Sequence, residues 1–404
     1  MQKQISQIIS YAVFVFALII ILINLVSLVF PALIVTQINE TIPGENTFEL
    51  GSWTVPLITT NIGILVFGIL FYKNKIPSVV KKYVNFIYSF EVSRNVALLV
   101  FVILLFGYIG YSMQDIGEDE ADTWGDYTHL LGVIEKWPEM RGGNFATLEV
   151  LHVKNFLIKS SLVLFNNPKV VPFFESIVLV ILTYFFTVKI THNRFAGLVS
   201  MIVLIQSYTF LRFDTLMTYA NDWTLFYLLS LYLIYVKWPL SPISYFASIL
   251  SKPLSAAFLP MTLFFIYRAE VHMKKKIRTF VMYVGIVIVF AVVGLTIENP
   301  LIVADEYNYV DFWAAFTTWA FQLRFDTIFL LFILPLTVCL FLKSRSGFPQ
   351  ADSAIVLIAG VILAMPLLAG LTGYNVHPYR YVPLMVFFAI GVGMLFAKKV
   401  KQEA

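Results

Sequence analysis

The feature that most constrains this chain is a succession of apolar stretches that leaves little room for a water-exposed fold. Charged residues make up 13% of its 404 residues, whereas a soluble domain carries about a quarter, and the mean hydropathy is +0.82. A helix that crosses a bilayer needs roughly 20 apolar residues. We therefore predict an all-α, polytopic membrane protein of about twelve transmembrane helices. The apolar stretches lie near 8–37, 53–73, 93–113, 171–190, 195–211, 215–236, 240–251, 253–268, 279–297, 326–342, 353–372 and 379–397.

Two of these stretches, 240–251 and 253–268, are too short to cross a bilayer separately. Ser251, Lys252 and Pro253 stand between them. Proline ends a helix because it lacks a backbone N–H and clashes with the preceding turn. We predict two short or re-entrant helices that meet at this point, at one face of the membrane.

The basic residues indicate the orientation. If the N-terminus is cytoplasmic and the predicted spans alternate, 19 of the 28 Lys and Arg residues lie in inner loops and 19 of the 24 acids lie outside. This distribution follows the positive-inside rule. We therefore expect a multi-pass protein of the plasma membrane with both termini cytoplasmic and two large outer loops, 114–170 and 298–325. The net charge of +4 is spread over many short inner loops, which argues against a nucleic-acid partner.

The densest group of acids lies in the first outer loop. Its candidate functional residues are Asp119, Glu120, Asp122, Asp126 and His129. Asp122, Asp126 and His129 are spaced i, i+4, i+7, so they share one face if residues 122–137 form a helix. A carboxylate here can act as a general base toward a hydroxyl or as a ligand for a divalent cation. The alternative is a solvated acidic loop that its charge keeps outside.

The same loop contains a second amphipathic segment, residues 147–165. Its apolar positions, with His152 and Lys159 between them, predict another helix at the membrane surface. His152 and Lys159 can then face a lipid phosphate, either as part of a site or as simple headgroup contacts.

Three later motifs carry a resemblance when they are taken together with the acidic loop. They are Tyr219-Ala220-Asn221-Asp222-Trp223, Ile249-Leu250-Ser251-Lys252-Pro253 followed by Pro260, and His377-Pro378-Tyr379-Arg380-Tyr381-Val382-Pro383. In this order they resemble the GT-C membrane glycosyltransferases, such as protein O-mannosyltransferases and lipid A aminoarabinose transferases. The similarity covers about 93–397, with 1–92 as an extra N-terminal two-span hairpin and 398–404 as a basic cytoplasmic tail. The family's Lys-Pro-Pro stretch is missing from residues 138–155.

The resemblance implies a GT-C fold and a function. One sugar would move from a polyprenyl-phosphate carrier to a glycan, lipid or protein acceptor on the outer face, with inversion at the anomeric carbon. Asp122, or else Asp126, would be the catalytic base. The implied substrate-binding residues are Asp119, Glu120, His129, His152, Lys159, Asp222, Lys252, Glu306, His377, Arg380 and Tyr381. Among these, Lys252 and Arg380, with His377 or Lys159, would neutralise the departing lipid phosphate. No cofactor would be required; if a divalent cation takes part, its ligands would be Asp122, Asp126 and His129.

Two other classes of membrane protein stay open at this point. A glycan polymerase or ligase would use a lipid-diphosphate donor and rely on Arg and His in the second outer loop. A transporter or flippase would perform no chemistry and would place ionisable residues near the bilayer midplane.

Overall fold

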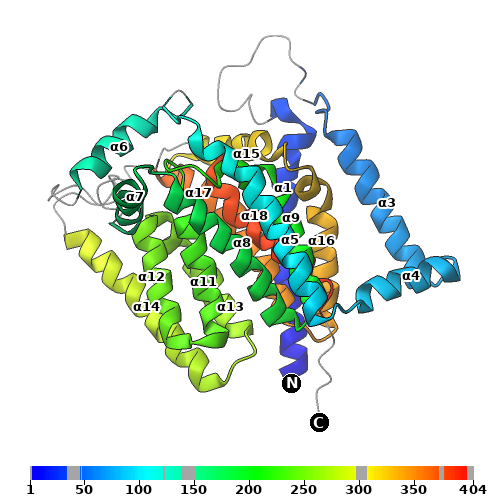
Figure 1. The fold of residues 1–404 in the computed structure, drawn as a ribbon. Helices are drawn as coiled ribbons and strands as arrows, with labels where there is room; N and C mark the ends of the chain where they lie inside the picture. Colours follow the sequence, from blue (N-terminus) through cyan, green and yellow to red (C-terminus); the bar gives the residue numbers. More distant parts are fainter. Residues whose placement is uncertain are drawn as a thin grey trace. The chain divides into compact units, whose positions relative to one another are not determined.

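The computed structural model describes residues 2–33, 46, 48–121, 123–137, 152–296, 307–372 and 377–397. These residues form helices and connecting turns, and no strand occurs among them (Figure 1). The prediction of an all-α protein is therefore confirmed for this part of the chain.

Six of the described helices are long and apolar enough to cross a membrane. They are α1 (Gln2–Val29), α3 (Thr54–Tyr72), α5 (Arg94–Ser112), α8 (Val170–Thr191), α16 (Thr327–Arg345) and α17 (Gln350–Thr372). Several other predicted spans are shorter as helices: α9 (Arg194–Ile205), α11 (Asp222–Val236), and the segments Pro253–Arg268 and Pro378–Met394. The polar residues of 206–221 separate α9 from α11, with only the six-residue α10 (Tyr208–Phe213) between them. The described residues thus form a helical chain of membrane type with six candidate spans, and they do not confirm the predicted number of twelve.

The chain divides into two compact units. Unit 1 comprises Met1–Leu99, Phe186–Thr209 and Glu306–Ala404, and unit 2 comprises Val100–Phe185 and Phe210–Asp305. Within unit 1, α1 is tied to α17 because the Ser10 hydroxyl donates to Asp352 Oδ2 at 2.7 Å. Helix α18 (Val382–Met394) lies very close to α9, since a Cβ added at Gly393 would stand 2.7 Å from the Ala196 carbonyl oxygen. Glycine therefore permits this close helix packing.

Unit 2 is built around α11 and the short helix α12 (Ser241–Ser251). The Ser248 hydroxyl donates to the Trp223 carbonyl at 2.7 Å, which links the two helices. After α12 the chain continues into η4 (Pro253–Phe258), α13 (Leu259–Arg268) and α14 (Met273–Thr296). Lys252 is extended, at φ −154° and ψ 114°, as expected of a residue before proline. The predicted pair of short helices that meet at Lys252 is confirmed.

Both predicted outer loops contain helices. The first contains the 3₁₀ turn η1 (Met113–Gly117), α6 (Asp126–Lys136) and α7 (His152–Phe165), and the second contains α15 (Tyr309–Leu323). Helix α6 begins at Asp126, and the described residues Thr123, Trp124 and Gly125 precede it in a turn in which Trp124 N donates to the Glu120 carbonyl at 2.9 Å. The helix considered over residues 122–137 is therefore present from Asp126 onward, with His129 on it. Asp122 lies outside the described residues.

Candidate functional site

The acidic segment of unit 2 borders a cavity of about 220 Å³. Acids contribute much of its lining, and one lysine, one arginine and one tryptophan complete it. The lining residues are Asp115, Glu118, Asp119, Glu120, Thr123, Trp124, Lys169, Arg212, Thr215 and Leu216. Residues within 115–124, Lys169 and residues within 212–216 therefore form one concave, highly charged site.

Lys169 holds the first part of this segment in place. Its ammonium group is buried and donates to the carbonyl oxygens of Asp115 at 2.6 Å and Glu118 at 3.0 Å. Asp115 lies in η1 and Glu118 directly follows it. Lys169 thus fixes the turn that carries the acids.

Glu120 connects the acidic segment to residues 217–218. Its side chain is 2% exposed. The carboxylate accepts hydrogen bonds from the backbone N–H of Met217 at 2.7 Å, from the backbone N–H of Thr218 at 3.1 Å, and from the Thr218 hydroxyl at 2.7 Å. Glu120 was predicted as a substrate contact, but its carboxylate oxygens are occupied by the chain itself, so its main role is to position the cavity wall.

Aromatic rings support the cavity beside Arg212. The Trp124 ring packs edge-on against Tyr219, with centroids 4.9 Å apart. It also contacts the Phe213 ring in a tilted arrangement, with centroids 5.8 Å apart. The Arg212 guanidinium is exposed and lies 5.5 Å from the centroid of the Trp124 ring. A guanidinium is attracted to an aromatic face by a cation–π interaction, so Trp124 helps to position Arg212 at the cavity. The sequence interpretation assigned no role to Arg212 or Trp124.

The remaining acids of the segment differ in their surroundings. Asp119 is exposed, lines the cavity, and accepts a local hydrogen bond from Ala121 N at 2.9 Å. Asp126 is exposed at the first position of α6 and accepts from the Tyr219 hydroxyl at 3.2 Å. His129 is exposed one turn further along α6. Asp122 lies outside the described residues, between Glu120 and Thr123 in the sequence.

Beneath this site lies a buried charge cluster of Lys154, Glu175 and Asp222, from α7, α8 and α11. All three side chains are less than 10% exposed. The carboxylate oxygens of Glu175 accept no hydrogen bond within the described parts of the chain, whereas Asp222 interacts with the Ser251 hydroxyl and the Trp223 backbone. Lys154 interacts electrostatically with both carboxylates. The Lys154 ammonium also donates to the Thr218 carbonyl at 2.7 Å. Asp222 is the first residue of α11; it was named as a substrate contact, but it lies in this buried cluster and is not among the residues that line the acidic cavity.

The other residues predicted to contact a phosphate differ in their surroundings. Lys159 donates to the Glu135 carbonyl at 2.8 Å and so joins α7 to α6. Lys252 is half-buried, and its ammonium nitrogen lies 5.7 Å from the Trp223 ring centroid. His152 is exposed at the start of α7.

The last motif belongs to unit 1. His377 is exposed and precedes η5 (Pro378–Tyr381), which leads directly into α18. The Arg380 guanidinium is half-buried and lies 6.0 Å from the Tyr379 ring centroid, whereas Tyr381 is fully buried. Tyr381 is thus a core residue and not an exposed substrate contact. Glu306, the predicted contact in the second outer loop, lies outside the described residues.

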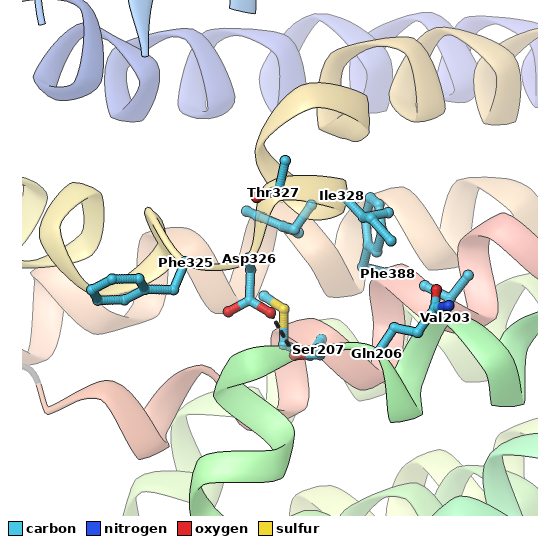
Figure 2. Close-up of a pocket in the computed structure, with 10 residues that line it drawn as sticks. Val203, Gln206, Ser207, Phe325, Asp326, Thr327, Ile328 and Phe388 are labelled. Carbon is cyan, nitrogen blue, oxygen red and sulfur yellow. Dashed lines mark hydrogen bonds between the residues drawn. The ribbon is translucent and has the colours of Figure 1, made fainter. Parts of the chain in front are cut away.

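Unit 1 contains a second cavity, of about 140 Å³, shown in Figure 2. Its polar centre is Asp326, which accepts from the Ser207 hydroxyl at 2.7 Å and from Thr209 N at 3.1 Å, as well as from the Thr209 hydroxyl. Most of the other lining side chains are apolar, among them Phe325, Phe329 and Phe388. Because its carboxylate is already occupied, we assign no ligand to this cavity.

Within the described ranges, no group of three or more His, Cys, Asp or Glu side chains is arranged to hold a metal ion. Asp122, one of the three ligands named above, is outside those ranges.

Comparison with protein-family models, with curated proteins and with solved structures finds no match for this chain. The resemblance to GT-C enzymes therefore depends on the four sequence motifs alone.

Proposed function

We propose that this protein is a membrane glycosyltransferase of GT-C type that transfers a hexose or pentose from a polyprenyl-phosphate carrier to an acceptor outside the cytoplasm. The observation that carries the proposal is the cavity of unit 2, in which exposed carboxylates and the Arg212 guanidinium line the same space. Such a transfer needs a base for the acceptor hydroxyl and a cation for the departing phosphate. Both kinds of group are present there.

The reaction proceeds by one displacement. A carboxylate accepts the proton of the acceptor hydroxyl while the hydroxyl oxygen forms a bond to the anomeric carbon. The bond from the anomeric carbon to the phosphate oxygen breaks, and its electron pair remains on the phosphate. The products are the glycosylated acceptor with inverted configuration and the polyprenyl phosphate.

The base belongs to residues 119–126. Asp122 stays the first choice because its sequence neighbours Glu120 and Thr123 both line the cavity. Asp126 stays the second choice, although it is hydrogen-bonded to Tyr219 and is not among the lining residues. Asp119 is added as a candidate because it is exposed and lines the cavity. Glu120 is unsuited to this role since its oxygens accept three hydrogen bonds.

Arg212 lines the cavity and is exposed. We assign its guanidinium as the cation that binds the departing phosphate. A guanidinium can bind a phosphate through two parallel N–H donors, and a fixed positive charge beside the leaving oxygen stabilises the charge that develops there. Lys169 also lines the cavity, but its ammonium serves the Asp115 and Glu118 carbonyls. Trp124 offers a ring against which the sugar can stack.

The proposal is tested with the purified full-length protein in liposomes and a panel of radiolabelled polyprenyl-phosphate sugars. A membrane extract supplies the acceptor. We expect one donor to be consumed with stoichiometric release of polyprenyl phosphate, whereas the same sugars on a polyprenyl diphosphate are not consumed. Consumption of the diphosphate donors alone would favour the glycan polymerase or ligase and would reject the proposal.

The transporter or flippase is the second candidate, and one observation favours it. Ionisable groups buried in a membrane protein frequently belong to ion or substrate pathways, and Lys154, Glu175 and Asp222 are buried together. If a fluorescent polyprenyl-phosphate sugar crosses the liposome membrane with this protein while no glycosidic bond is broken, the transporter is the correct class.

A further inference from the structure

Helix α4 (Ser78–Ser89) follows α3 after a tight turn, and none of its residues is buried. Figure 1 shows it leaving the end of α3 as a separate short helix. Asn74, in the left-handed region at φ 55°, forms the turn, and its side-chain oxygen accepts a hydrogen bond from Lys81. The orientation of α4 relative to α3 is therefore fixed at their junction.

The sequence of α4 gives it two distinct faces. At 100° per residue, Val79, Val80, Tyr83 and Phe86 lie on one face, and Lys81, Lys82 and Asn85 lie on the other. The apolar face is uncovered: Val79 is 76% exposed, Tyr83 65% and Phe86 54%. A pattern of this kind is typical of a helix that lies in the membrane interface.

Charge identifies what covers this face. Residues 73–90 contain Lys73, Lys75, Lys81 and Lys82 and no acid. Helix α3, a candidate span, ends at Tyr72, so these lysines lie where the chain leaves the hydrocarbon region. Basic clusters directly beside a span attract anionic lipid headgroups.

Contacts in unit 1 fix the far end of the helix. Tyr88 stacks on Phe396 with ring centroids 5.7 Å apart, and Phe90 packs edge-on against Phe195 at 5.0 Å. These contacts leave Val79, Tyr83 and Phe86 uncovered. The apolar face of α4 is therefore uncovered even though contacts at both ends hold the helix in place.

We propose that α4 is an in-plane interfacial helix that binds anionic phospholipids, with its apolar face among the acyl chains and its lysines at the headgroups. This surface is separate from the acidic cavity and does not depend on the proposed sugar transfer.

The test uses the full-length protein in vesicles of phosphatidylcholine and phosphatidylglycerol. A fluorophore is attached at Phe86→Cys or, on the opposite face, at Asn85→Cys, each combined with Cys339→Ser; Val79→Cys is the second apolar-face position. We expect lipid-borne quenchers to act on the label at position 86 or 79, and a water-soluble quencher to act on the label at position 85. Equal access of the water-soluble quencher to both faces would overturn the proposal. Shielding of position 86 from both kinds of quencher would also overturn it, because a protein or a second copy would then cover the face.

Headgroup selectivity is measured with quenchers on phosphatidylglycerol and on phosphatidylcholine. A lysine beside an anionic surface favours binding about five-fold, so Lys75→Gln with Lys82→Gln should reduce the excess quenching by phosphatidylglycerol at least about five-fold. Lys274→Gln with Lys275→Gln, an equal change of charge on α14, should leave it unchanged. Equal quenching by the two lipids in the wild type would overturn the anionic-lipid assignment.

Discussion

Glu120 holds Thr218 through two hydrogen bonds, one from the backbone N–H at 3.1 Å and one from the hydroxyl at 2.7 Å. On the other side of the same residue, the Thr218 carbonyl accepts from Lys154 at 2.7 Å. Thr218 therefore links the cavity wall to the buried charge cluster.

Glu120→Gln should destabilise the protein. The amide carries no charge and provides one acceptor oxygen for three donors, so buried N–H groups of residues 217–218 lose their partner. We expect the free energy of unfolding to fall by about 3 kcal/mol, measured by unfolding in mixed detergent micelles. Glu118→Gln, at an exposed neighbour in the same segment, is the control and should change it by less than about 0.5 kcal/mol. Equal stability of the Glu120 variant and the wild type would contradict the positioning role.

Lys154→Met should be strongly destabilising because it leaves Glu175 and Asp222 buried without their cation. Removing one partner of a buried ion pair costs about 3–5 kcal/mol. Adding Glu175→Gln and Asp222→Asn to Lys154→Met should restore most of the stability, since no uncompensated charge then remains. Lys159→Met on the same helix removes a lysine that is partly exposed and should cost under about 1 kcal/mol. A triple variant no more stable than Lys154→Met would show that the cluster is not held by charge.

Asp214 should make the stability depend on pH. Burial raises the pKa of this carboxyl to about 7, although the Ser112 hydroxyl, which donates to Oδ2 at 2.6 Å, partly opposes the rise. In the unfolded chain the pKa is about 3.9. Below pH 4 the group is protonated in both states. Between about pH 4 and pH 7 only the unfolded chain releases the proton, so stability falls as pH rises, by roughly 4 kcal/mol in total.

The measurement for Asp214 is the free energy of unfolding between pH 4 and pH 8. Asp214→Asn keeps an oxygen for the Ser112 hydroxyl and cannot titrate, so its profile should lack this decline. If the wild type and Asp214→Asn have parallel profiles, the carboxyl does not titrate as we expect.

Arg212→Gln should impair the use of the donor because it removes the cation at the leaving phosphate. Loss of one such oxyanion-stabilising group costs about 10²- to 10³-fold in rate. We expect kcat/KM for the polyprenyl-phosphate sugar to fall within this range, while Arg278→Gln on α14 leaves it unchanged. An unaffected Arg212 variant would mean that the phosphate binds elsewhere, for example at Lys252 or Arg380.

The sequence predicted the acids of this site but only part of their arrangement. The acidic segment was recognisable because Asp119, Glu120 and Asp126 stand out in an apolar chain. Arg212 and Lys169 were not assigned to it, because they lie some 50 to 90 residues further along the chain and no local spacing connects them with the acids. The role of Glu120 depends on backbone N–H groups of residues 217–218, which side-chain patterns cannot reveal.

Helix boundaries, too, were predictable only where the signal lies close by in the sequence. The break at Lys252 was predictable because Pro253 acts locally on the residue before it. Apolar stretches alone do not show how long each helix is, since hydropathy does not register the turns between α9 and α11. Lys159 was predicted to face a lipid phosphate. In the structure its ammonium group donates a hydrogen bond to the Glu135 carbonyl of α6. The sequence could not indicate this contact because it does not specify where α6 lies.

The most direct test of the proposed function compares Asp119→Asn, Asp122→Asn and Asp126→Asn with wild type and with Glu135→Gln, an exposed acid of α6 that does not line the cavity. The measured quantity is the rate of polyprenyl-phosphate sugar consumption by full-length protein in liposomes, with the folded fraction of each variant determined in parallel. A positioned general base contributes about 10²- to 10⁴-fold, so we predict that one of the three variants, first of all Asp122→Asn, loses turnover by that factor while Glu135→Gln retains it. Wild-type turnover in all three variants would contradict the assignment of the acidic cavity as the site of sugar transfer.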